Sequence, residues 1–468
     1  MSLKLYRQVH IMTEQFEDQG GLATSDPNRL VRWISSQVMS RLFTIKAVNK
    51  RRAAAERARC KKKQPHIIEY FHQLDDGYSH LAAQLLVKMA DRYDIELVCH
   101  LVSTSVSKNV AEPEMLARLS RYDAHQIAPD YGLEFAEQND ALDPAQIKKA
   151  QGILTAVTGA KRVSAVEPVS RALWSNDISE LDRLASEFGC ASETEVDATL
   201  ASGNARRGAL KHYSGAMFYY GGEWYWGVDR LYHLEHRLGE LGLDGDHGAP
   251  MLAPRQEPNW GAVRSDGSLI LEIYVSLRSP YSAVIFDRAV QLARDSGVTL
   301  RVRPVLPMVM RGVPATPIKG LYIFMDAARE AQALGIDYGK FSDPIGEPAR
   351  RCYSLYPWAV TQGKGTELIS SFLRHAFVLG VSMLADKGLR KVVEAAGLDW
   401  QIAKNHLGEA GWESLLEENR LVMYEAGCWG VPSFRLLDGS GMSIVNLWGQ
   451  DRLWVIAREI RKQLQDPV

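Results

Sequence analysis

Two stretches of this 468-residue chain, 203 residues apart, resemble each other closely enough to constrain its whole architecture. The first, at residues 66–103, reads HIIEYFHQLDDGYSHLAAQLLVKMADRYDIELVCHLVS, and the second, at residues 269–306, reads LILEIYVSLRSPYSAVIFDRAVQLARDSGVTLRVRPVL. They align without a gap, so that Glu69 falls on Glu272 and Tyr78 falls on Tyr281. Each stretch predicts a strand, a turn, a helix and a second strand. Similarity of this kind at a fixed spacing indicates tandem copies of one domain.

The ends of the two copies also match. WGVDRL at residues 226–231 resembles WGQDRL at residues 448–453, and a short β-like run precedes each of them, at residues 217–220 and 433–437. Between these parts, each copy has more than a hundred residues with largely helical periodicity. The order strand, helix, strand, helical insertion, strand, strand, helix predicts an α/β layer fold in which a right-handed crossover joins the first two strands.

Length and local composition indicate where the domains begin and end. A chain of 468 residues is too long for one ordinary core, and its 46% hydrophobic and 24% charged residues are typical of a globular protein. A stretch rich in Gly and Pro separates the two copies. We therefore predict an N-terminal helical extension at residues 1–63, a first domain at 64–241, a linker at 242–267 and a second domain at 268–468.

The N-terminal extension predicts an amphipathic helix. Ser25-Asp26-Pro27 offers a helix cap followed by proline in the first turn. The apolar residues that follow recur at helical spacing and are Val31, Ile34, Val38, Leu42 and Ile45. The helix runs into a basic segment, residues 46–63, which carries nine Lys and Arg residues against one acid, Glu56. This segment predicts either a solvated helix face or a docking site for an anionic partner.

Charge and cysteine content exclude several classes of protein. The net charge of −1 gives no field that favours nucleic acid. No window approaches the run of about 18 apolar residues that a membrane span requires, so we expect no membrane partner. Five scattered cysteines predict neither a disulfide framework nor a metal site, and they favour a reducing, cytoplasmic compartment. They are Cys60, Cys99, Cys190, Cys352 and Cys428.

In the second copy, Ser279-Pro280-Tyr281-Ser282 ends the first strand and opens a helix. A helix start leaves unpaired N–H groups with a positive partial charge, and Pro280 suits the first turn because it has no N–H. Ser279 is then either a plain helix cap or part of a site for a small negative group. The motif Gly430-Val431-Pro432-Ser433-Phe434 favours the site, because a proline directly before a β-like run fits an edge or a cis turn.

Together with Arg303-Pro304-Val305-Leu306 and the WGQDRL ending, these motifs resemble the DsbA-like superfamily of thioredoxin-fold proteins. The nearest likeness is to 2-hydroxychromene-2-carboxylate isomerases and kappa-class glutathione transferases. The resemblance covers residues 269–465 well and residues 66–241 weakly, and it implies two tandem thioredoxin-like domains. Where redox members carry Cys-x-x-Cys, this chain has serines, so no disulfide can form there. The resemblance implies that glutathione is the cofactor, its thiolate held by Ser279 and the helix N-terminus.

The resemblance also implies roles for five further residues. Pro432 corresponds to the family's cis-proline, and Val431 would offer its backbone to the cysteinyl unit of glutathione. Gln450 and Asp451 correspond to residues that hold the γ-glutamyl end, although Asp451 also suits an ordinary helix cap. Lys319 is a further candidate for the loop that faces glutathione, and its alternative is a solvated surface lysine.

The first copy departs from this pattern. Asp76 stands at the place of Ser279, and we place Met217 opposite Pro432. A carboxylate would repel a thiolate, so we expect the first domain to have lost glutathione chemistry and to serve as a structural partner, giving a pseudo-dimer within one chain. Alternatively, Asp76 is a turn residue or the general acid or base of a different site.

These observations lead to two hypotheses from different classes. The first is a glutathione-dependent isomerase or transferase that acts on an aromatic or conjugated small molecule by transient covalent catalysis. The alternative is a non-catalytic, DsbA-like binding or scaffold protein. The first hypothesis is favoured because Ser279 and Pro432 are present in one copy beside their loss in the other. The motifs do not specify the substrate.

Overall fold

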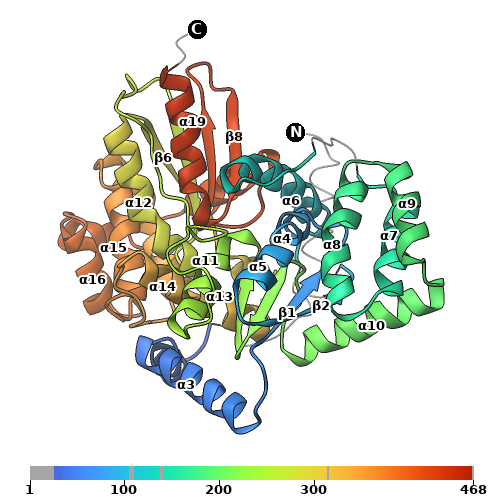
Figure 1. Ribbon diagram of the computed structural model, residues 1–468. Helices are drawn as coiled ribbons and strands as arrows, with labels where there is room; N and C mark the ends of the chain where they lie inside the picture. Colours follow the sequence, from blue (N-terminus) through green and yellow to red (C-terminus); the bar gives the residue numbers. More distant parts are fainter. Residues whose placement is uncertain (1–25, 105–109, 137–140, 314–315, 466–468) are drawn as a thin grey trace. The chain divides into compact units, whose positions relative to one another are not determined.

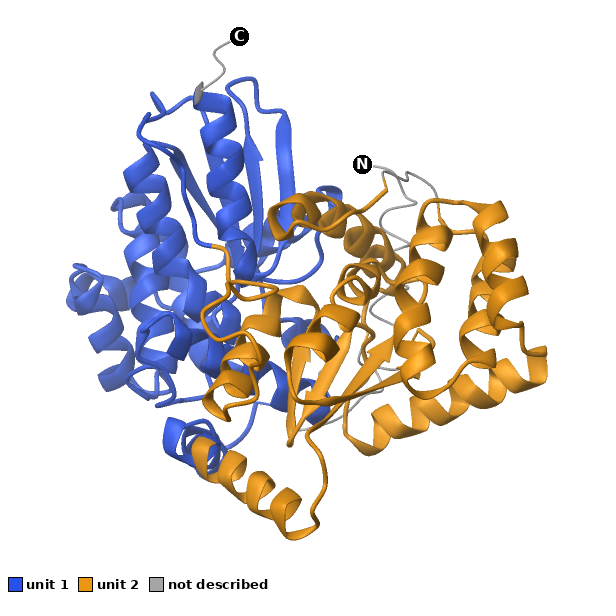
Figure 2. Ribbon diagram, viewed as in Figure 1, with its two compact units in different colours: residues 1–48, 257–468 blue, residues 49–256 orange. Residues whose placement is uncertain are grey.

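The computed structural model describes residues 26–104, 110–136, 141–313 and 316–465. The chain divides into two compact units, coloured separately in Figure 2: residues 49–256 form one, and residues 1–48 with 257–468 form the other. We call them the N-terminal unit and the C-terminal unit. Each contains a four-stranded sheet with helices, which confirms the predicted α/β class. Among the helices that the structure describes, none combines the length and the apolar character needed to cross a membrane.

The sheet of the N-terminal unit has the strand order β2-β1-β3-β4. Strand β1 (Ile67–His72) runs parallel to β2 (Glu96–Leu101) and antiparallel to β3 (Met217–Tyr220), which pairs with β4 (Glu223–Trp226). In Figure 1, helices α7, α8 and α9 lie side by side in this unit. Its helices are α4 (Gly77–Ala83), α5 (Leu86–Arg92), α6 (Pro113–Ile127), η1 (Ala128–Tyr131), α7 (Pro144–Ala156), α8 (Gly159–Trp174), α9 (Ile178–Phe188), α10 (Glu193–Ala209), η2 (Val228–Arg230) and α11 (Leu231–Glu240).

The sheet of the C-terminal unit has the corresponding order β6-β5-β7-β8. Strand β5 (Ile270–Val275) runs parallel to β6 (Thr299–Pro304) and antiparallel to β7 (Ser433–Leu437), which pairs with β8 (Ser443–Trp448). Helices α12 and α19 pack side by side against this sheet (Figure 1). The helices are α12 (Pro280–Ser296), η3 (Met308–Arg311), α13 (Pro317–Ala333), α14 (Glu347–Thr361), α15 (Gly365–Phe377), α16 (Asp386–Ala395), α17 (Trp400–Ala403), η4 (Lys404–His406), α18 (Trp412–Glu425), η5 (Gln450–Arg452) and α19 (Leu453–Gln465).

The first strand of each sheet lies at its centre. Strand β1 is buried from Ile68 to His72 and β5 from Leu271 to Val275, as expected of a parallel strand with helices on both faces. The parallel pairing confirms the predicted crossover in both units. The predicted β-like runs at residues 217–220 and 433–437 coincide with β3 and β7. The strand pattern was readable from the sequence because these strands are short, apolar and bounded by turn residues.

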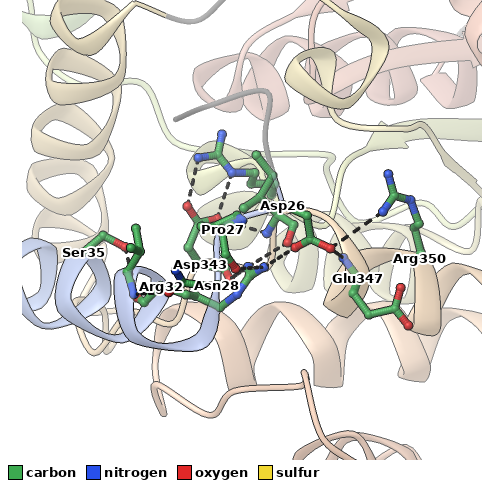
Figure 3. Close-up of polar contacts among 11 residues, drawn as sticks. Asp26, Pro27, Asn28, Arg32, Ser35, Asp343, Glu347 and Arg350 are labelled. Carbon is green, nitrogen blue, oxygen red and sulfur yellow. Dashed lines mark hydrogen bonds and ion pairs between the residues drawn. The ribbon is translucent and has the colours of Figure 1, made fainter. Parts of the chain in front are cut away.

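The N-terminal helix α2 (Arg29–Leu42) belongs to the C-terminal unit. Its cap is Asn28, whose side chain accepts a hydrogen bond of 3.0 Å from the N–H of Val31. The predicted cap at Ser25-Asp26-Pro27 is therefore wrong, and Ser25 itself lies outside the described residues. The carboxylate of Asp26 instead accepts from the N–H of Glu347, at the start of α14 (Figure 3).

A buried arginine anchors α2 to the C-terminal unit. Arg32 is 3% exposed, and its guanidinium donates to the carbonyls of Asp343 and Ile345 at 2.7 Å each. The same guanidinium forms an ion pair with Asp26 (Figure 3). One turn further on, the Ser36 hydroxyl accepts from the N–H of Asp343 at 3.1 Å. The polar side of the helix is thus the side that docks.

The apolar stripe predicted on α2 is exposed. Ile34 is 48% exposed and Val38 is 51% exposed, whereas Phe43, just after the helix, is buried and stacks on Phe324 at 5.8 Å. The helix that follows, α3 (Ile45–Lys61), carries most of the basic segment and has no buried residue. One of its arginines, Arg52, pairs with Glu223 at 2.6 Å.

Candidate functional site

The motif around Ser279 folds as a strand-to-helix turn, as predicted. Strand β5 ends at Val275, and α12 begins at Pro280 with Ser279 as its cap. The Ser279 hydroxyl oxygen accepts a hydrogen bond of 3.1 Å from the N–H of Ser282. Ser279 is half-buried, so its hydroxyl borders the N-terminus of a 17-residue helix without being enclosed in the core.

The loop before β7 meets Ser279. The Val431–Pro432 peptide bond is cis, which confirms the expectation for Pro432. The Ser279 hydroxyl donates to the Val431 carbonyl at 3.3 Å, across 152 residues of sequence. Among the described residues, no hydrogen bond reaches the N–H of Val431. The fold therefore brings together three of the predicted site residues: a hydroxyl, a strand-like backbone and the cis-proline.

Gln450 and Asp451 lie on the short helix η5, next to this loop. The Pro432 carbonyl accepts from the N–H of Gly449, directly before η5, at 3.0 Å. The Asp451 carboxylate packs closely against Gly449, and its Oδ1 atom lies 3.5 Å from a guanidinium nitrogen of Arg452. Asp451 therefore lies on the segment that is hydrogen-bonded to Pro432.

Gln450 directs its side chain into the unit and not toward the Val431 loop. Its side chain is 4% exposed, and its amide donates to the Glu330 carboxylate in α13 at 2.7 Å. The amide nitrogen is thereby engaged inside the unit. Any contact of Gln450 with a ligand would have to use its backbone or its amide oxygen.

Lys319 is buried, so its interpretation as a solvated surface lysine is wrong. It is 9% exposed in the first turn of α13, and burial lowers its pKa to about 8. Its ammonium group lies 5.7 Å from the centre of the Trp429 ring, which packs against Trp448 at 5.2 Å. Trp448 in turn packs against Gly430, so two indole rings link Lys319 to the Val431 loop. Helical periodicity could not reveal this burial because distant aromatic residues cause it.

Two polar pairs flank the start of α12, and the sequence analysis missed both. Arg278, directly before Ser279, forms a bidentate ion pair with Asp343 at 2.8 and 3.0 Å. The Tyr281 hydroxyl donates to Asp326 at 2.8 Å. A signal for the second pair was present in the sequence, since the N-terminal unit repeats it at the same spacing of 45 residues.

In the N-terminal unit, the Tyr78 hydroxyl donates to Asp123, also at 2.8 Å.

Asp76 caps α4 by accepting from the N–H and the hydroxyl of Ser79 at 3.0 and 2.8 Å. Burial raises the pKa of Asp76 to about 6, although the hydrogen bonds from Ser79 oppose the shift. Asp76 borders a cavity of about 70 Å³ that is also lined by Thr104 and Trp226. This volume holds little more than water.

The strand register corrects one predicted correspondence. Met217 pairs with Phe71 as Ser433 pairs with Tyr274, so Ala216, one residue earlier, lies at the place of Pro432. The loop bonds agree, because the Ala216 carbonyl accepts from Gly227 at 2.8 Å as the Pro432 carbonyl accepts from Gly449. The prediction that placed Met217 there was wrong by one residue. Both strand starts were predicted correctly, but the equivalence of residues in β3 and β7 follows from their pairing with β1 and β5.

All five cysteines have free thiols. Burial raises the pKa of Cys99 to about 12 and also raises that of Cys352. Cys428, 2% exposed, packs with Tyr274, Val305 and Met423 as a small hydrophobic residue. Within the described ranges, no three His, Cys, Asp or Glu side chains gather in a group that could hold a metal ion.

Comparison with known proteins places the C-terminal unit in a fold class. Residues 270–461 match the family described as "DSBA-like thioredoxin domain". The C-terminal part of the chain therefore has a DsbA-like thioredoxin fold, in agreement with its strand order. No curated protein matches the chain.

Several solved structures are also similar. A 2-hydroxychromene-2-carboxylate isomerase is 20% identical, with 41% of this chain and 95% of that chain covered and a TM-score of 0.35. A probable DsbA oxidoreductase from Streptomyces coelicolor is 18% identical, with coverage of 43% and 92% and a TM-score of 0.33. The cytosolic disulfide reductase DsbM from Pseudomonas aeruginosa is 16% identical, with coverage of 42% and 97% and a TM-score of 0.33.

Proposed function

We propose that the C-terminal unit is a glutathione-dependent isomerase or transferase of the 2-hydroxychromene-2-carboxylate isomerase or kappa glutathione transferase type, acting on an aromatic or conjugated small molecule. The observation that carries the proposal is the contact between the Ser279 hydroxyl, at the start of α12, and the Val431 carbonyl, beside the cis bond of Pro432. It joins the two motifs on which the resemblance rests.

The donor set at this place fits glutathione. The cysteinyl unit of a peptide pairs with a protein backbone through one N–H and one C=O. Val431, two residues before β7, carries an N–H that can donate and the C=O that accepts from Ser279. The N–H of Val431 has no partner among the described residues, so it can take one without breaking a native bond. Asp451 can accept from an ammonium group one loop away.

The Ser279 hydroxyl can donate a stronger hydrogen bond to a thiolate than the one it donates to the Val431 carbonyl. Its hydrogen bond to the Val431 carbonyl is long, 3.3 Å, and a charged sulfur is a stronger acceptor than a carbonyl. The N-terminus of α12 adds positive partial charge at the same place. When bound, glutathione would supply the thiol nucleophile that adds to the substrate. The chain's own part is to hold that thiol in its charged form and to orient it.

The N-terminal unit would then be a copy that has lost this chemistry. Shared strand order and the Tyr78–Asp123 and Tyr281–Asp326 pairs, at identical spacing, support descent from one tandem duplication. With Asp76 at the helix start, the N-terminal unit has an acceptor where a thiolate needs a donor. The pseudo-dimer arrangement and the cytoplasmic location remain predictions.

Calorimetry with glutathione on the intact chain tests the cofactor assignment. We expect wild type to bind at millimolar concentration, Asp451→Ala to weaken binding about tenfold, and Asp229→Ala, its counterpart in the N-terminal unit, to leave binding unchanged. Absence of binding to wild type would remove glutathione from the proposal. If Asp451→Ala and Asp229→Ala weakened glutathione binding equally, binding would not be specific to the C-terminal unit.

The role of Ser279 is tested by titrating the thiolate absorbance of the bound glutathione. Ser279→Ala should raise the pKa of the bound thiol by about one unit, because one charge-assisted hydrogen bond is lost. An unchanged pKa would contradict this role. Turnover is tested with an aromatic enone such as benzylideneacetone; binding of glutathione without isomerisation or conjugation would favour a non-catalytic binding protein.

A further inference from the structure

A cavity lies in the C-terminal unit, between α2 and the segment that joins α15 to α16. Its volume is about 540 Å³. Sites for small molecules have volumes of roughly 300–1,000 Å³. None of the residues proposed to hold glutathione lines this cavity, so it is a separate place on the same unit.

Cationic side chains from two helices line the cavity. Lys387 and Lys391 are four residues apart on α16, so they lie on one face of that helix, and Arg29 opens α2. All three are exposed, and none has an ion pair among the described residues. No aspartate or glutamate lines the cavity. The result is a pocket whose charged groups all have one sign.

The nearby carboxylates do not neutralise these cations, because other arginines already hold them. Asp26 is paired with Arg32, and Asp386, at the start of α16, is paired with Arg351. The positive charge of the pocket is therefore available to a ligand. A concave site lined by charge of one sign concentrates ligands of the opposite sign.

The rest of the wall is apolar and includes an unusually exposed tryptophan. Trp33 lies four residues after Arg29, on the same face of α2, and is 61% exposed. Phe341, Val381 and Leu384 also line the cavity. An exposed indole beside cations gives the pocket a flat apolar surface next to a positively charged one. This combination suits a ligand with a flat apolar part and an anionic group.

The walls of the pocket are held rigidly. Arg32, shown in Figure 3, donates to the carbonyls of Asp343 and Ile345 and so fixes α2 in place. Ser36 adds a hydrogen bond that it accepts from the N–H of Asp343. On the other side, Gly388 leaves no room for a Cβ atom against the Ser382 carbonyl, so α16 begins in direct contact with the loop before it. A pocket with fixed walls loses little freedom when a ligand binds.

We propose that this pocket binds a small organic anion that joins one carboxylate or sulfonate group to a flat apolar body. The anionic group lies against Lys387, Lys391 and Arg29, and the apolar body lies against Trp33. The proposal does not depend on the function proposed for Ser279.

Calorimetry on the full chain with naphthoate, and with naphthylmethanol as its uncharged counterpart, tests the proposal. Wild type is expected to bind naphthoate about tenfold more tightly than naphthylmethanol, because the alcohol cannot use the cations. Lys387→Gln/Lys391→Gln should remove this preference, and Trp33→Ala should weaken both ligands. Lys404→Gln/Arg374→Gln removes two exposed cations of the same unit that lie outside the pocket, and it should change nothing.

Three results would overturn the proposal. The first is wild type that binds neither ligand, or that binds both equally. The second is a loss in the control variant as large as that in Lys387→Gln/Lys391→Gln. The third is loss of naphthoate binding in Ser279→Ala or Asp451→Ala, which would place the ligand at the other site. Circular dichroism confirms folding, and Trp33→Ala provides an independent test should the lysine variant unfold.

Discussion

The two units have the same strand order but differ around the start of the first helix, where the candidate site of the C-terminal unit lies. Both sheets place the first strand at the centre, and both tie the helix after it to a buried aspartate through a tyrosine, Tyr78 in one and Tyr281 in the other. Both also bury a glutamate on the central strand, Glu69 or Glu272, against cationic partners. These pairs maintain the packing of strand, helix and insertion in each unit.

The differences lie at two short segments that meet beside the first helix. Asp76 and Ala216 in one unit stand where Ser279 and Pro432 stand in the other. Asp76 and Ser279 are half-buried, whereas Ala216 and Pro432 are buried directly before strands β3 and β7. The two units thus share buried polar pairs, which stabilise packing, and differ at two segments outside the strands, where residues vary more readily. Three pairs of substitutions at matched positions test this difference between the units, and they are given in order of expected effect.

The largest effect is expected for Glu272→Gln. The Glu272 side chain is 1% exposed and accepts from Arg301, Arg303 and Tyr274 at 2.7–2.9 Å. Burial alone would raise the pKa of Glu272, but the hydrogen bonds from these partners outweigh it, so the pKa is lowered overall. The charged carboxylate is therefore the stable form. Removing its charge breaks the ion pairs of a buried carboxylate and leaves Arg303, whose side chain is only 18% exposed, without its charged partner, so it should lower the free energy of unfolding by about 3 kcal/mol.

Glu69→Gln is the matched control in the N-terminal unit. The Glu69 side chain is less buried than that of Glu272, 11% exposed against 1%, so solvent screens its ion pairs more strongly and we expect a loss of about 1 kcal/mol. Urea denaturation gives the size of each loss, and hydrogen exchange of peptides from β1 and β5 assigns it to a unit. Equal losses would show that the two glutamates are equivalent in spite of their different burial.

Gly430→Ser is expected to have an intermediate effect. A Cβ atom at residue 430 would lie 2.5 Å from the indole nitrogen of Trp448, so the ring must shift, at a cost of about 2 kcal/mol. The register places Ser214 at the corresponding position of the N-terminal unit. Ser214→Gly should therefore cost less than about 1 kcal/mol. Thermal unfolding compares the two, and a cost for Gly430→Ser no larger than for Ser214→Gly would mean that the Trp448 side chain yields freely.

The smallest effect is expected for Asp76→Asn, and it depends on pH. Since the folded carboxyl has a pKa of about 6, the native state binds more protons than the unfolded state between about pH 4 and about pH 6. The free energy of unfolding of wild type should therefore fall as pH rises through this window. The side chain is only half-buried, so solvent limits the loss to about 1 kcal/mol, and Asp76→Asn should not show it.

Denaturant unfolding at several pH values measures this difference. As the reciprocal change, Ser279→Asp should give the C-terminal unit the same fall in stability between about pH 4 and about pH 6. A variant Asp76→Asn with the same pH dependence as wild type would show that other groups cause it.

The residues themselves show how far sequence reasoning reached. The SPYS turn and the positions of β3 and β7 were predictable because each depends on residues next to one another in the chain. The residues left Pro432 open between an edge and a cis turn, and the family resemblance gave the cis bond that the structure has. The burial of Lys319 and the pairing of Arg278 with Asp343 were not, since their partners come from other helices. The correspondence of Met217 with Pro432 was wrong although both strand starts were predicted, because the pairing with β1 and β5 decides which residues of β3 and β7 are equivalent.

The sequence by itself determined the order of strands and helices, the parallel crossover and the helix start at Ser279, because periodicity, caps and turn residues act over a few positions. The tertiary structure alone decided that Ser279 meets Val431 and that α2 docks through Arg32 on Asp343, 311 residues away. It also made the pocket beside Trp33. Contacts over such separations depend on which surfaces pack together, and a local pattern does not encode that choice.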